Sequence, residues 1–496
     1  MFEKNLSILT AFALYLGSMM MIGIYFWRKE QQNQTLSGYI LGGRSLGPWV
    51  TSMSAEASDM SGWMLMGLPG YAYLAGLEAG WIALGLALGT WANWSVVAKR
   101  LRSYTQISND SLTMPDYFEN RFRDNSKLLR VISAIFILIF FLIYTSSGFV
   151  AGGKLFNTVF GLDYTTAIIL GAFVVVFYTF LGGFLAVCYT DLIQGIMMFF
   201  AILIVPVTAM FLMGGPAATA NAIAALNPEM FNPFTAADGH TLSFIEIISL
   251  LGWGLGYFGQ PHILVRFMAI RDAQEIKEAT RIAMTWVVIS LTAAVAVGMV
   301  GRVFLKEELT GAAVETIFMI LTNNIFSSFI AGVIMSAILA AIMSTASSQL
   351  LVTASAVSQD FYKSILGRDS SEKELVFVSR MTVIIVSIIA VIMGLDQNNF
   401  ILDIVAYAWA GFGSAFGPAV FISLFWKRMT RNGALAGIVV GGLTVLIWKQ
   451  FGWLGLYEII PGFFLSSLAI YIVSIMDKEP DKAITEEFEK VRKSSI

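Results

Sequence analysis

The sequence is poor in cysteine, histidine and charged residues. Cys188 is its single cysteine, and His240 and His262 are its only histidines. One cysteine excludes a disulfide within the chain, and two histidines are too few for a histidine-rich metal or redox centre. Only 13% of the residues are charged and the net charge is −2, so the composition gives no support for nucleic-acid binding.

Apolar residues dominate instead. They make up 57% of the 496 residues, and the mean hydropathy is +0.74, far above the balance of soluble domains. This composition predicts an all-α polytopic membrane protein. Thirteen stretches are long and apolar enough to cross a hydrocarbon core of about 30 Å. They lie near 6–27, 47–74, 76–98, 130–152, 163–184, 188–213, 243–266, 279–304, 324–350, 376–395, 398–426, 433–450 and 457–476.

The basic residues are unequally shared between alternate loops. Most of the 31 lysines and arginines fall in one set of loops and in the C-terminal tail. The other set holds only Lys4, Lys154, Arg302, Lys306 and Lys449. Because basic residues gather on the cytoplasmic side of membrane proteins, this asymmetry predicts an external N-terminus and a cytoplasmic C-terminus.

Two of the predicted spans are interrupted by small, polar and helix-breaking residues. The first interruption covers Ser54–Gly70 and the second covers Gly252–Pro261. The second contains a G-x-G-x-x-G pattern, but it lies inside a membrane segment with no preceding strand, which excludes a nucleotide loop. Paired broken helices in two halves of a chain are typical of inverted-repeat transporters, where the free backbone groups bind substrate and ions.

The segment order therefore predicts one membrane transport domain, 1–496, with two inverted five-helix repeats. The predicted parts are an extra N-terminal helix and loop (1–44), the first repeat (45–213), an external linker (214–242), the second repeat (243–426), two C-terminal helices (427–476) and a cytoplasmic tail (477–496). A stripe of small residues, Gly433, Gly437 and Gly441, favours helix packing over a dimer interface.

Two acidic residues within or next to predicted spans are candidate functional groups. Asp59 lies in the first interruption, where a carboxylate is costly unless it faces protein or water. The alternative for Asp59 is a simple cap on a broken helix. Asp191 lies near the cytoplasmic start of its helix, where an interfacial acid favoured by the helix dipole is an equal alternative.

Hydroxyl and aromatic residues complete the candidates. Ser344 and Thr345 are adjacent in an apolar helix and could either bind sodium together with backbone carbonyls or bond back to their own helix. Tyr144, Trp253 and Tyr257 could equally be anchors at the membrane interface or ordinary packing residues, so singly they indicate little. His262 and Arg266 are expected to snorkel at the inner end of their helix, and a proton role for His262 is disfavoured.

Several motifs closely resemble the sodium/solute symporter family, in particular its bacterial proline-transporting branch. The resemblance covers nearly the whole chain. Its motifs are Tyr39–Pro48, Ala57–Trp63, Met66–Gly70, Gly252–His262, Ile338–Thr345, Tyr407–Gly413, Arg428–Gly437 and Trp448–Gly462. One departure is Ala79, which stands where some close relatives carry an acid, with Glu78 one residue earlier.

The resemblance implies a leucine-transporter-type fold with 13 transmembrane helices in a bacterial cell membrane, and sodium-coupled uptake of L-proline. It implies a sodium site at Ala57, Met60, Ala341, Ser344 and Thr345. It places proline beside Trp63, Tyr144, Trp253, Tyr257 and Pro261. Asp59 would couple the two sites, and Arg44 and Asp191 would contribute to cytoplasmic gating.

The expected partners are therefore L-proline, the co-transported sodium ion and the lipid bilayer, with no nucleic acid and no obligate protein partner. The chain is not expected to be an enzyme, because no soluble stretch is long enough for a catalytic domain. A symporter for another small solute on the same fold is the nearest alternative. A membrane sensor is a remote one, because the short tail after Met476 offers no signalling domain.

Overall fold

The computed structural model describes residues 2–30, 38, 41–181, 183–366 and 370–494, and in this part of the chain every regular element is a helix. The first half contains α1 (Phe2–Glu30), α3 (Pro48–Asp59), α4 (Leu68–Ala75), α5 (Gly80–Ala92), α6 (Lys99–Ile107), α7 (Met114–Phe122), α8 (Leu128–Phe160), α9 (Tyr164–Leu181) and α10 (Phe184–Leu212). After α11 (Pro216–Leu226) follow α12 (Phe244–Leu251), α13 (Pro261–Ala269), α14 (Ile276–Phe304), α15 (Ile317–Ile325), α16 (Ser328–Ser355), α17 (Glu372–Met393), α18 (Ile401–Phe425), α19 (Arg431–Phe451), α20 (Ile459–Met476) and α21 (Lys482–Ser494).

The first predicted interruption is a real break. Helix α3 ends at Asp59, and Met60 leaves the helical conformation with φ −81° and ψ 76°. The chain resumes in the π-helix η2 (Trp63–Gly67) before α4, whose second residue is Pro69. A proline near a helix start lacks only a donor that would be unpaired there, so it favours a new helix at this point. The break leaves the end of α3 deep inside the protein.

The helix is also broken at the second predicted interruption. The glycine-rich segment Gly252–Gly259 forms the tight 3-10 helix η6, and Gln260 is extended with φ −79° and ψ 107°. Pro261 then starts α13. Glycine destabilises an α-helix by about 1 kcal/mol relative to alanine, which favours the shift to the 3-10 form.

Close helix contacts explain several of the glycines. Helix α5 packs against η6, and a Cβ on Gly89 would lie 2.2 Å from the carbonyl oxygen of Gly254. The stripe on α19 packs inside the same chain, because a Cβ on Gly433 or Gly437 would collide with α20, and one on Gly441 with α18. The prediction that this stripe serves helix packing is therefore confirmed.

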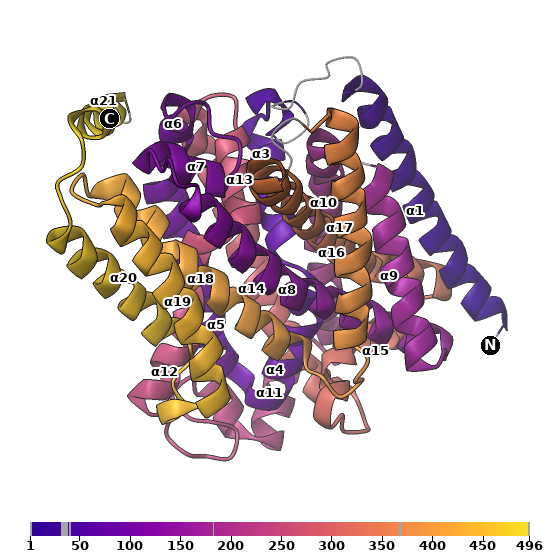
Figure 1. The fold of residues 1–496 in the computed structure, drawn as a ribbon. Helices are drawn as coiled ribbons and strands as arrows, with labels where there is room; N and C mark the ends of the chain where they lie inside the picture. The colour runs from indigo at the N-terminus through magenta and orange to yellow at the C-terminus, as the bar shows by residue number, and fades with distance from the viewer. Residues whose placement is uncertain (1, 31–37, 39–40, 182, 367–369, 495–496) are drawn as a thin grey trace.

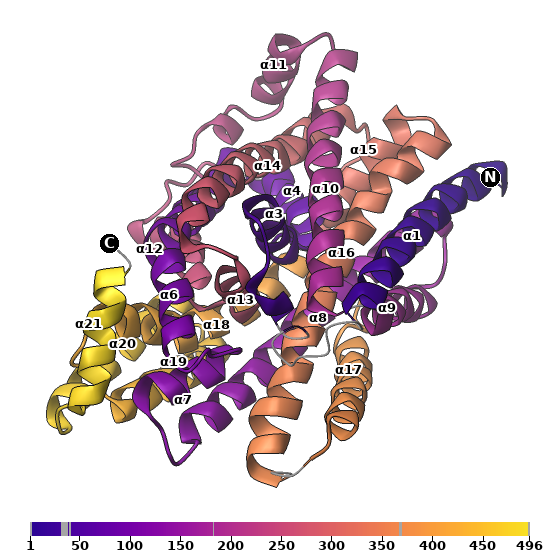
Figure 2. The same ribbon diagram turned by 90° about the horizontal axis from the view of Figure 1, so that it is seen from above.

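Helix α16 lies among the other helices, whereas α12, which leads into the second broken segment, lies at the edge of the molecule (Figures 1 and 2). Helix α16 packs against α1, α3, α8 and α10, and most of its residues from Ala331 to Leu350 are buried. The N-terminal end of α1 lies at the opposite end of the molecule from the C-terminus in Figure 1. The predicted linker contains the short helix α11, and the predicted tail contains α21, which packs on α6.

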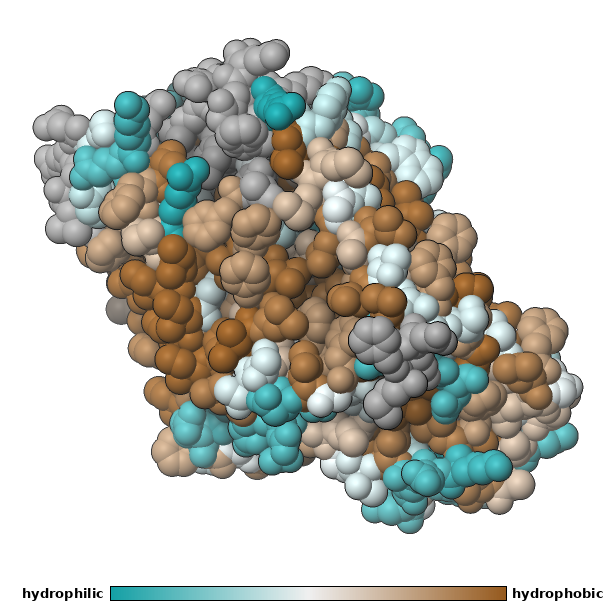
Figure 3. Space-filling view, turned by 90° about the vertical axis from the view of Figure 1, so that its right-hand side faces the viewer, coloured by the Kyte–Doolittle hydropathy of each residue, from teal (hydrophilic) through white to brown (hydrophobic). Residues whose placement is uncertain are grey.

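A hydrophobic band crosses one face of the molecule. Figure 3 shows apolar residues across the middle of one face and hydrophilic residues gathered toward its two ends. Among the described residues, ten helices are long and apolar enough to cross a membrane. Residues 63–107 form one continuous helical stretch, whereas Tyr164–Phe180 and Phe244–Gly259 are shorter apolar helices. The count of thirteen spans therefore remains a prediction.

Candidate functional site

The two breaks meet at Asp59. Its side-chain Oδ2 accepts a hydrogen bond of 2.6 Å from the Tyr257 hydroxyl of η6. Its backbone oxygen accepts hydrogen bonds of 3.1 Å from Trp63 Nε1 and from the Tyr144 hydroxyl of α8. Because the carboxylate binds the opposite broken helix, Asp59 does more than cap α3.

The predicted aromatic residues are brought together around this junction. Trp63, Tyr144, Trp253 and Tyr257 are all at most 5% exposed, so the alternative of interfacial anchoring is wrong. The rings of Trp63 and Trp253 lie 6.3 Å apart. Pro261 is buried at the start of α13, next to His262, whose ring lies 6.0 Å from that of Tyr144. These four aromatic side chains and Pro261 form a buried cluster, called here the aromatic enclosure, with hydrogen-bonding groups at the helix breaks.

Trp409 of α18 belongs to the same enclosure and was missed by the sequence reasoning. Its Nε1 donates to the Trp253 carbonyl at 2.7 Å, and its ring packs edge-on against Tyr257 at 4.9 Å. The motif Tyr407–Gly413 carried the only sequence signal for it.

The oxygen atoms predicted to bind sodium include the Ala57 carbonyl, which lies two residues before Asp59 in α3, and hydroxyls of α16. The Ser344 hydroxyl donates to the carbonyl of Ala57 at 2.7 Å, and the Thr345 hydroxyl lies 3.4 Å from the same oxygen. Ser344 also bonds back to Ala341 at 3.2 Å, so the local alternative and the cross-helix contact both occur. Met60 is buried at the break, but no described side-chain contact joins it to this group. Neutral hydroxyl and carbonyl oxygens of this kind suit a hard cation.

Asp191 is part of a buried ion pair on the predicted cytoplasmic side of the breaks. Its Oδ2 accepts from Arg266 at 3.2 Å and from the Ser54 hydroxyl at 2.7 Å. Arg266 also donates to Ser348 at 2.5 Å and to the carbonyl of His262 at 2.8 Å. The expectation that His262 and Arg266 snorkel at the membrane surface is wrong, because they are 0% and 1% exposed. The interfacial alternative for Asp191 is wrong for the same reason.

This ion pair joins four elements that converge on the predicted cytoplasmic side. Asp191 comes from α10, Arg266 from α13, Ser54 from α3 and Ser348 from α16. A basic and an acidic residue in two apolar helices are a recognisable pairing signal, because each is costly in a membrane without the other. The sequence alone does not show that α10 and α13 are neighbours.

Arg44 lies apart from this pair. It donates to Asp110 at 2.9 Å, to the Ser111 carbonyl at 2.9 Å and to the Met268 carbonyl at 2.6 Å. Burial lowers the pKa of its guanidinium, an effect that the neighbouring Asp110 opposes. Arg44 therefore fastens the start of the first repeat to the ends of α6 and α13, with no described contact to Asp191.

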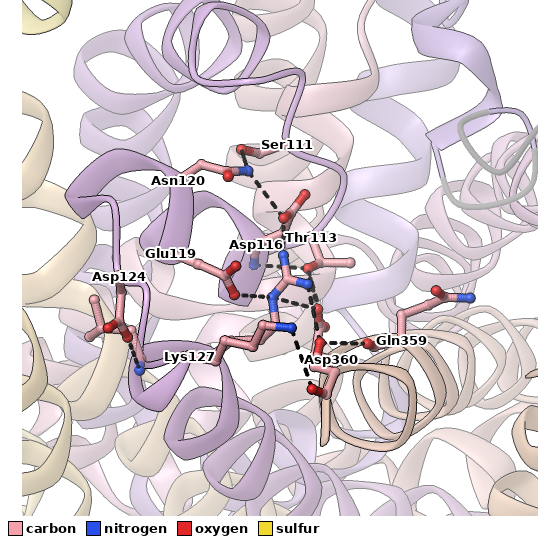
Figure 4. A network of polar contacts seen from close by, with 12 residues as sticks. Ser111, Thr113, Asp116, Glu119, Asn120, Asp124, Lys127, Gln359 and Asp360 are labelled. Atoms are coloured by element: carbon pink, nitrogen blue, oxygen red, sulfur yellow. Dashed lines mark hydrogen bonds and ion pairs between the residues drawn. The ribbon is translucent and has the colours of Figure 1, made fainter. Parts of the chain in front are cut away.

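A polar cluster, called here the Arg130 cluster, lies at the C-terminal end of α16, the helix that carries Ser344 and Thr345 (Figure 4). Helix α16 continues as the π-helix η9 (Ala356–Leu366), which carries the buried Asp360. Arg130 of α8 pairs with Asp116, with Glu119 at 2.7 Å and with Asp360 at 3.7 Å. The Thr113 hydroxyl donates to Asp360 at 3.2 Å. The cluster fixes the end of α16 to α7 and α8.

A further ion pair lies near the opposite ends of the helices. Lys154 Nζ lies 2.6 Å from Glu315, whose carboxylate also accepts from the backbone N–H groups of Ile401 and Leu402. Both charged side chains are buried. In the sequence, Lys154 is marked only as one of the few basic residues on the predicted external side.

Buried aromatic and polar groups at two helix breaks define a class of protein. They make this molecule a secondary transporter with discontinuous helices. Solved structures share the fold. A Na⁺-coupled sialic acid symporter in a substrate-bound outward-open state gives a TM-score of 0.79 at 19% identity, covering 96% of this chain and 99% of that one. MhsT in complex with L-phenylalanine gives a TM-score of 0.52 at 13% identity, covering 86% of this chain and 97% of that one. The predicted leucine-transporter-type fold is confirmed.

The chain belongs to the sodium:solute symporter family, whose model matches residues 39–441. A sodium/proline symporter of Escherichia coli is 50% identical over 97% of this chain and 95% of its own length. A high-affinity proline transporter of Bacillus subtilis is 52% identical over 95% of this chain and 98% of its own. The resemblance inferred from the motifs is confirmed, and the chain is a multi-pass membrane protein.

Proposed function

We propose that the chain is a secondary active transporter that couples inward sodium movement to uptake of L-proline. The observation that carries the proposal is the contact of Ser344 and Thr345 with the Ala57 carbonyl, two residues before Asp59. The names of the proline-transporting relatives support the choice of substrate.

Sodium would take the oxygen atoms that these hydroxyls and carbonyls offer. The proposed ligands are the carbonyls of Ala57, Met60 and Ala341 and the hydroxyls of Ser344 and Thr345. An ion held there attracts the oxygens of α3 and α16 toward one point, which stabilises the end of α3. Asp59 then holds Tyr257 through their 2.6 Å hydrogen bond, so ion binding orders the aromatic enclosure.

Proline would lie beside Trp63, Tyr144, Trp253, Tyr257 and Pro261. Its compact apolar ring suits aromatic walls, and its charged ends need the hydrogen-bonding groups that broken helices leave free. Release toward the cytoplasm requires the elements joined by Asp191 and Arg266 to separate. We therefore assign that ion pair, together with Arg44, to the cytoplasmic gate.

The proposed orientation places the N-terminus outside and the C-terminus in the cytoplasm of a bacterial cell. The inequality of the basic loops supports it, as do the termini at opposite ends of the molecule in Figure 1. In this orientation the Lys154–Glu315 pair faces the external side and the Arg130 cluster faces the cytoplasm.

The test is initial uptake of labelled L-proline into proteoliposomes. An inward sodium gradient is compared with an equal potassium gradient, and unlabelled amino acids, sugars and carboxylates are offered as competitors. We expect saturable uptake that needs sodium and is inhibited best by proline. Equal uptake in both gradients would refute sodium coupling. Stronger inhibition by another solute would assign the same transporter to that solute.

A further inference from the structure

Gln260 lies between the two halves of the second broken helix and is 0% exposed. Its backbone oxygen accepts from the N–H groups of Ile263 and Leu264, which begins α13. Its side chain does not cap this helix. The side chain of a residue at this position is therefore available for another purpose.

The hydrogen bonds fix the orientation of the Gln260 amide. Its Nε2 donates to the carbonyl oxygens of Gly256 at 3.2 Å and Trp409 at 3.3 Å. Both partners are acceptors only, so exchanging the amide oxygen and nitrogen would place two acceptors together. Oε1 therefore points away from these carbonyls. It is buried, and no described residue donates a hydrogen bond to it.

A second unpaired acceptor belongs to the same junction. Asp59 uses Oδ2 for the Tyr257 hydroxyl, and its buried Oδ1 has no donor among the described residues. Tyr257 precedes Gln260 by three residues, and Pro261 follows it directly. Trp409, which accepts from Gln260, also packs against Tyr257. Gln260 is thus hydrogen-bonded to both η6 and α18, the two elements that carry Tyr257 and Trp409.

We propose that Gln260 Oε1 and Asp59 Oδ1 accept the two hydrogens of a cyclic secondary ammonium group. This inference rests on the proposed function and names the part of the site that recognises the substrate's amine. A secondary ammonium carries two N–H donors, matching two buried acceptors to which no described residue donates. An N-methylated substrate retains one donor, and a ring-oxygen analogue has none, so the site rejects both.

The test compares inhibition constants for L-proline and (S)-tetrahydro-2-furoic acid, in which the ring nitrogen is replaced by oxygen. Both compounds compete with labelled proline for uptake by proteoliposomes. The native protein is expected to prefer proline strongly. Gln260→Met keeps the side-chain length and removes the acceptor. The preference ratio, which is the inhibition constant of the ring-oxygen analogue divided by that of proline, should then fall by about tenfold. The reason is that an unmade hydrogen bond leaves one N–H donor of proline unpaired.

Gln194→Met is the matched control. Gln194 is also buried and also has an unpaired Oε1, but its Nε2 donates to Tyr15 outside the enclosure. Its substitution should leave the ratio unchanged. If Gln260 had a purely structural role, its substitution would weaken the binding of both compounds equally. An unchanged ratio of their inhibition constants in Gln260→Met would therefore overturn the inference.

Gln260→Glu decides the question if the methionine variant does not fold. Glutamate retains an acceptor for the substrate, and its other oxygen, when protonated, can donate to one of the carbonyls that Gln260 Nε2 binds, so the preference for proline over the ring-oxygen analogue should be retained. A weaker preference would contradict the inference. If the native protein shows no sodium-driven proline uptake, the proposed function fails. If the native protein shows this uptake, and only the preference ratios of the Gln260 variants differ from those expected, the inference alone fails.

Discussion

At the scale of single residues, the Thr345 hydroxyl is expected to bind the coupled ion. Thr345→Ala removes one neutral oxygen next to the Ala57 carbonyl, 3.4 Å away. We expect the sodium concentration for half-maximal proline uptake to rise about tenfold, equivalent to roughly 1.4 kcal/mol. Uptake measured across a series of sodium concentrations checks this.

Two control variants separate ion binding from helix stability. Thr345→Ser keeps the hydroxyl and should retain most of the sodium affinity. Thr353→Ala removes a buried hydroxyl of the same helix that donates to the Gln349 carbonyl of its own helix at 2.7 Å. It should leave the sodium dependence unchanged. An unaltered sodium dependence in Thr345→Ala would remove Thr345 from the ion site.

The Tyr257 hydroxyl is the direct link between the two broken helices. Tyr257→Phe removes the 2.6 Å hydrogen bond to Asp59 while keeping the ring against Trp409. A hydrogen bond to a carboxylate contributes about 1.5–3 kcal/mol, so the apparent affinity for proline should fall at least tenfold. Tyr164→Phe, which loses a 2.9 Å bond to Gly394, is the control. Equal affinities in the two variants would show that the link is dispensable.

At the scale of helices, the Asp191–Arg266 pair is expected to hold α10 and α13 together. Arg266→Met leaves a buried carboxylate without its cation, and breaking a buried pair costs about 3–5 kcal/mol. We expect a large drop in thermal stability in detergent and a loss of uptake. The double substitution with Asp191→Leu should recover much of the stability, because it removes both charges. Additive losses would show that the two residues are not energetically coupled.

Sequence patterns predict helix breaks better than they predict partners. Glycine, proline and polar residues mark Ser54–Gly70 and Gly252–Pro261 as interruptions because their effect on a helix is local. The pairing of Asp191 with Arg266 depends instead on the neighbouring positions of α10 and α13. The same holds for Trp409, whose contact with Trp253 joins residues 156 positions apart. Local composition carries no information about such contacts, so Arg266 was misplaced at the surface and Trp409 was missed.

At the scale of the whole molecule, the proposed symport is electrogenic. Zwitterionic proline carries no net charge, so one coupled sodium ion moves one positive charge inward. A membrane potential of about −100 mV supplies roughly 2.3 kcal/mol per charge. A tenfold sodium gradient adds about 1.4 kcal/mol. Together, about 3.7 kcal/mol, they sustain roughly 500-fold accumulation of proline.

The corresponding measurement uses proteoliposomes with a fixed sodium gradient and a potential set by a potassium gradient and an ionophore. An inside-negative potential should raise the accumulation ratio about tenfold for every 60 mV, since each tenfold change corresponds to roughly 1.4 kcal/mol. About tenfold per 30 mV would mean that two charges move with each proline. No response to the potential would contradict symport of a single cation with a zwitterion and would require a compensating charge movement through the same broken helices.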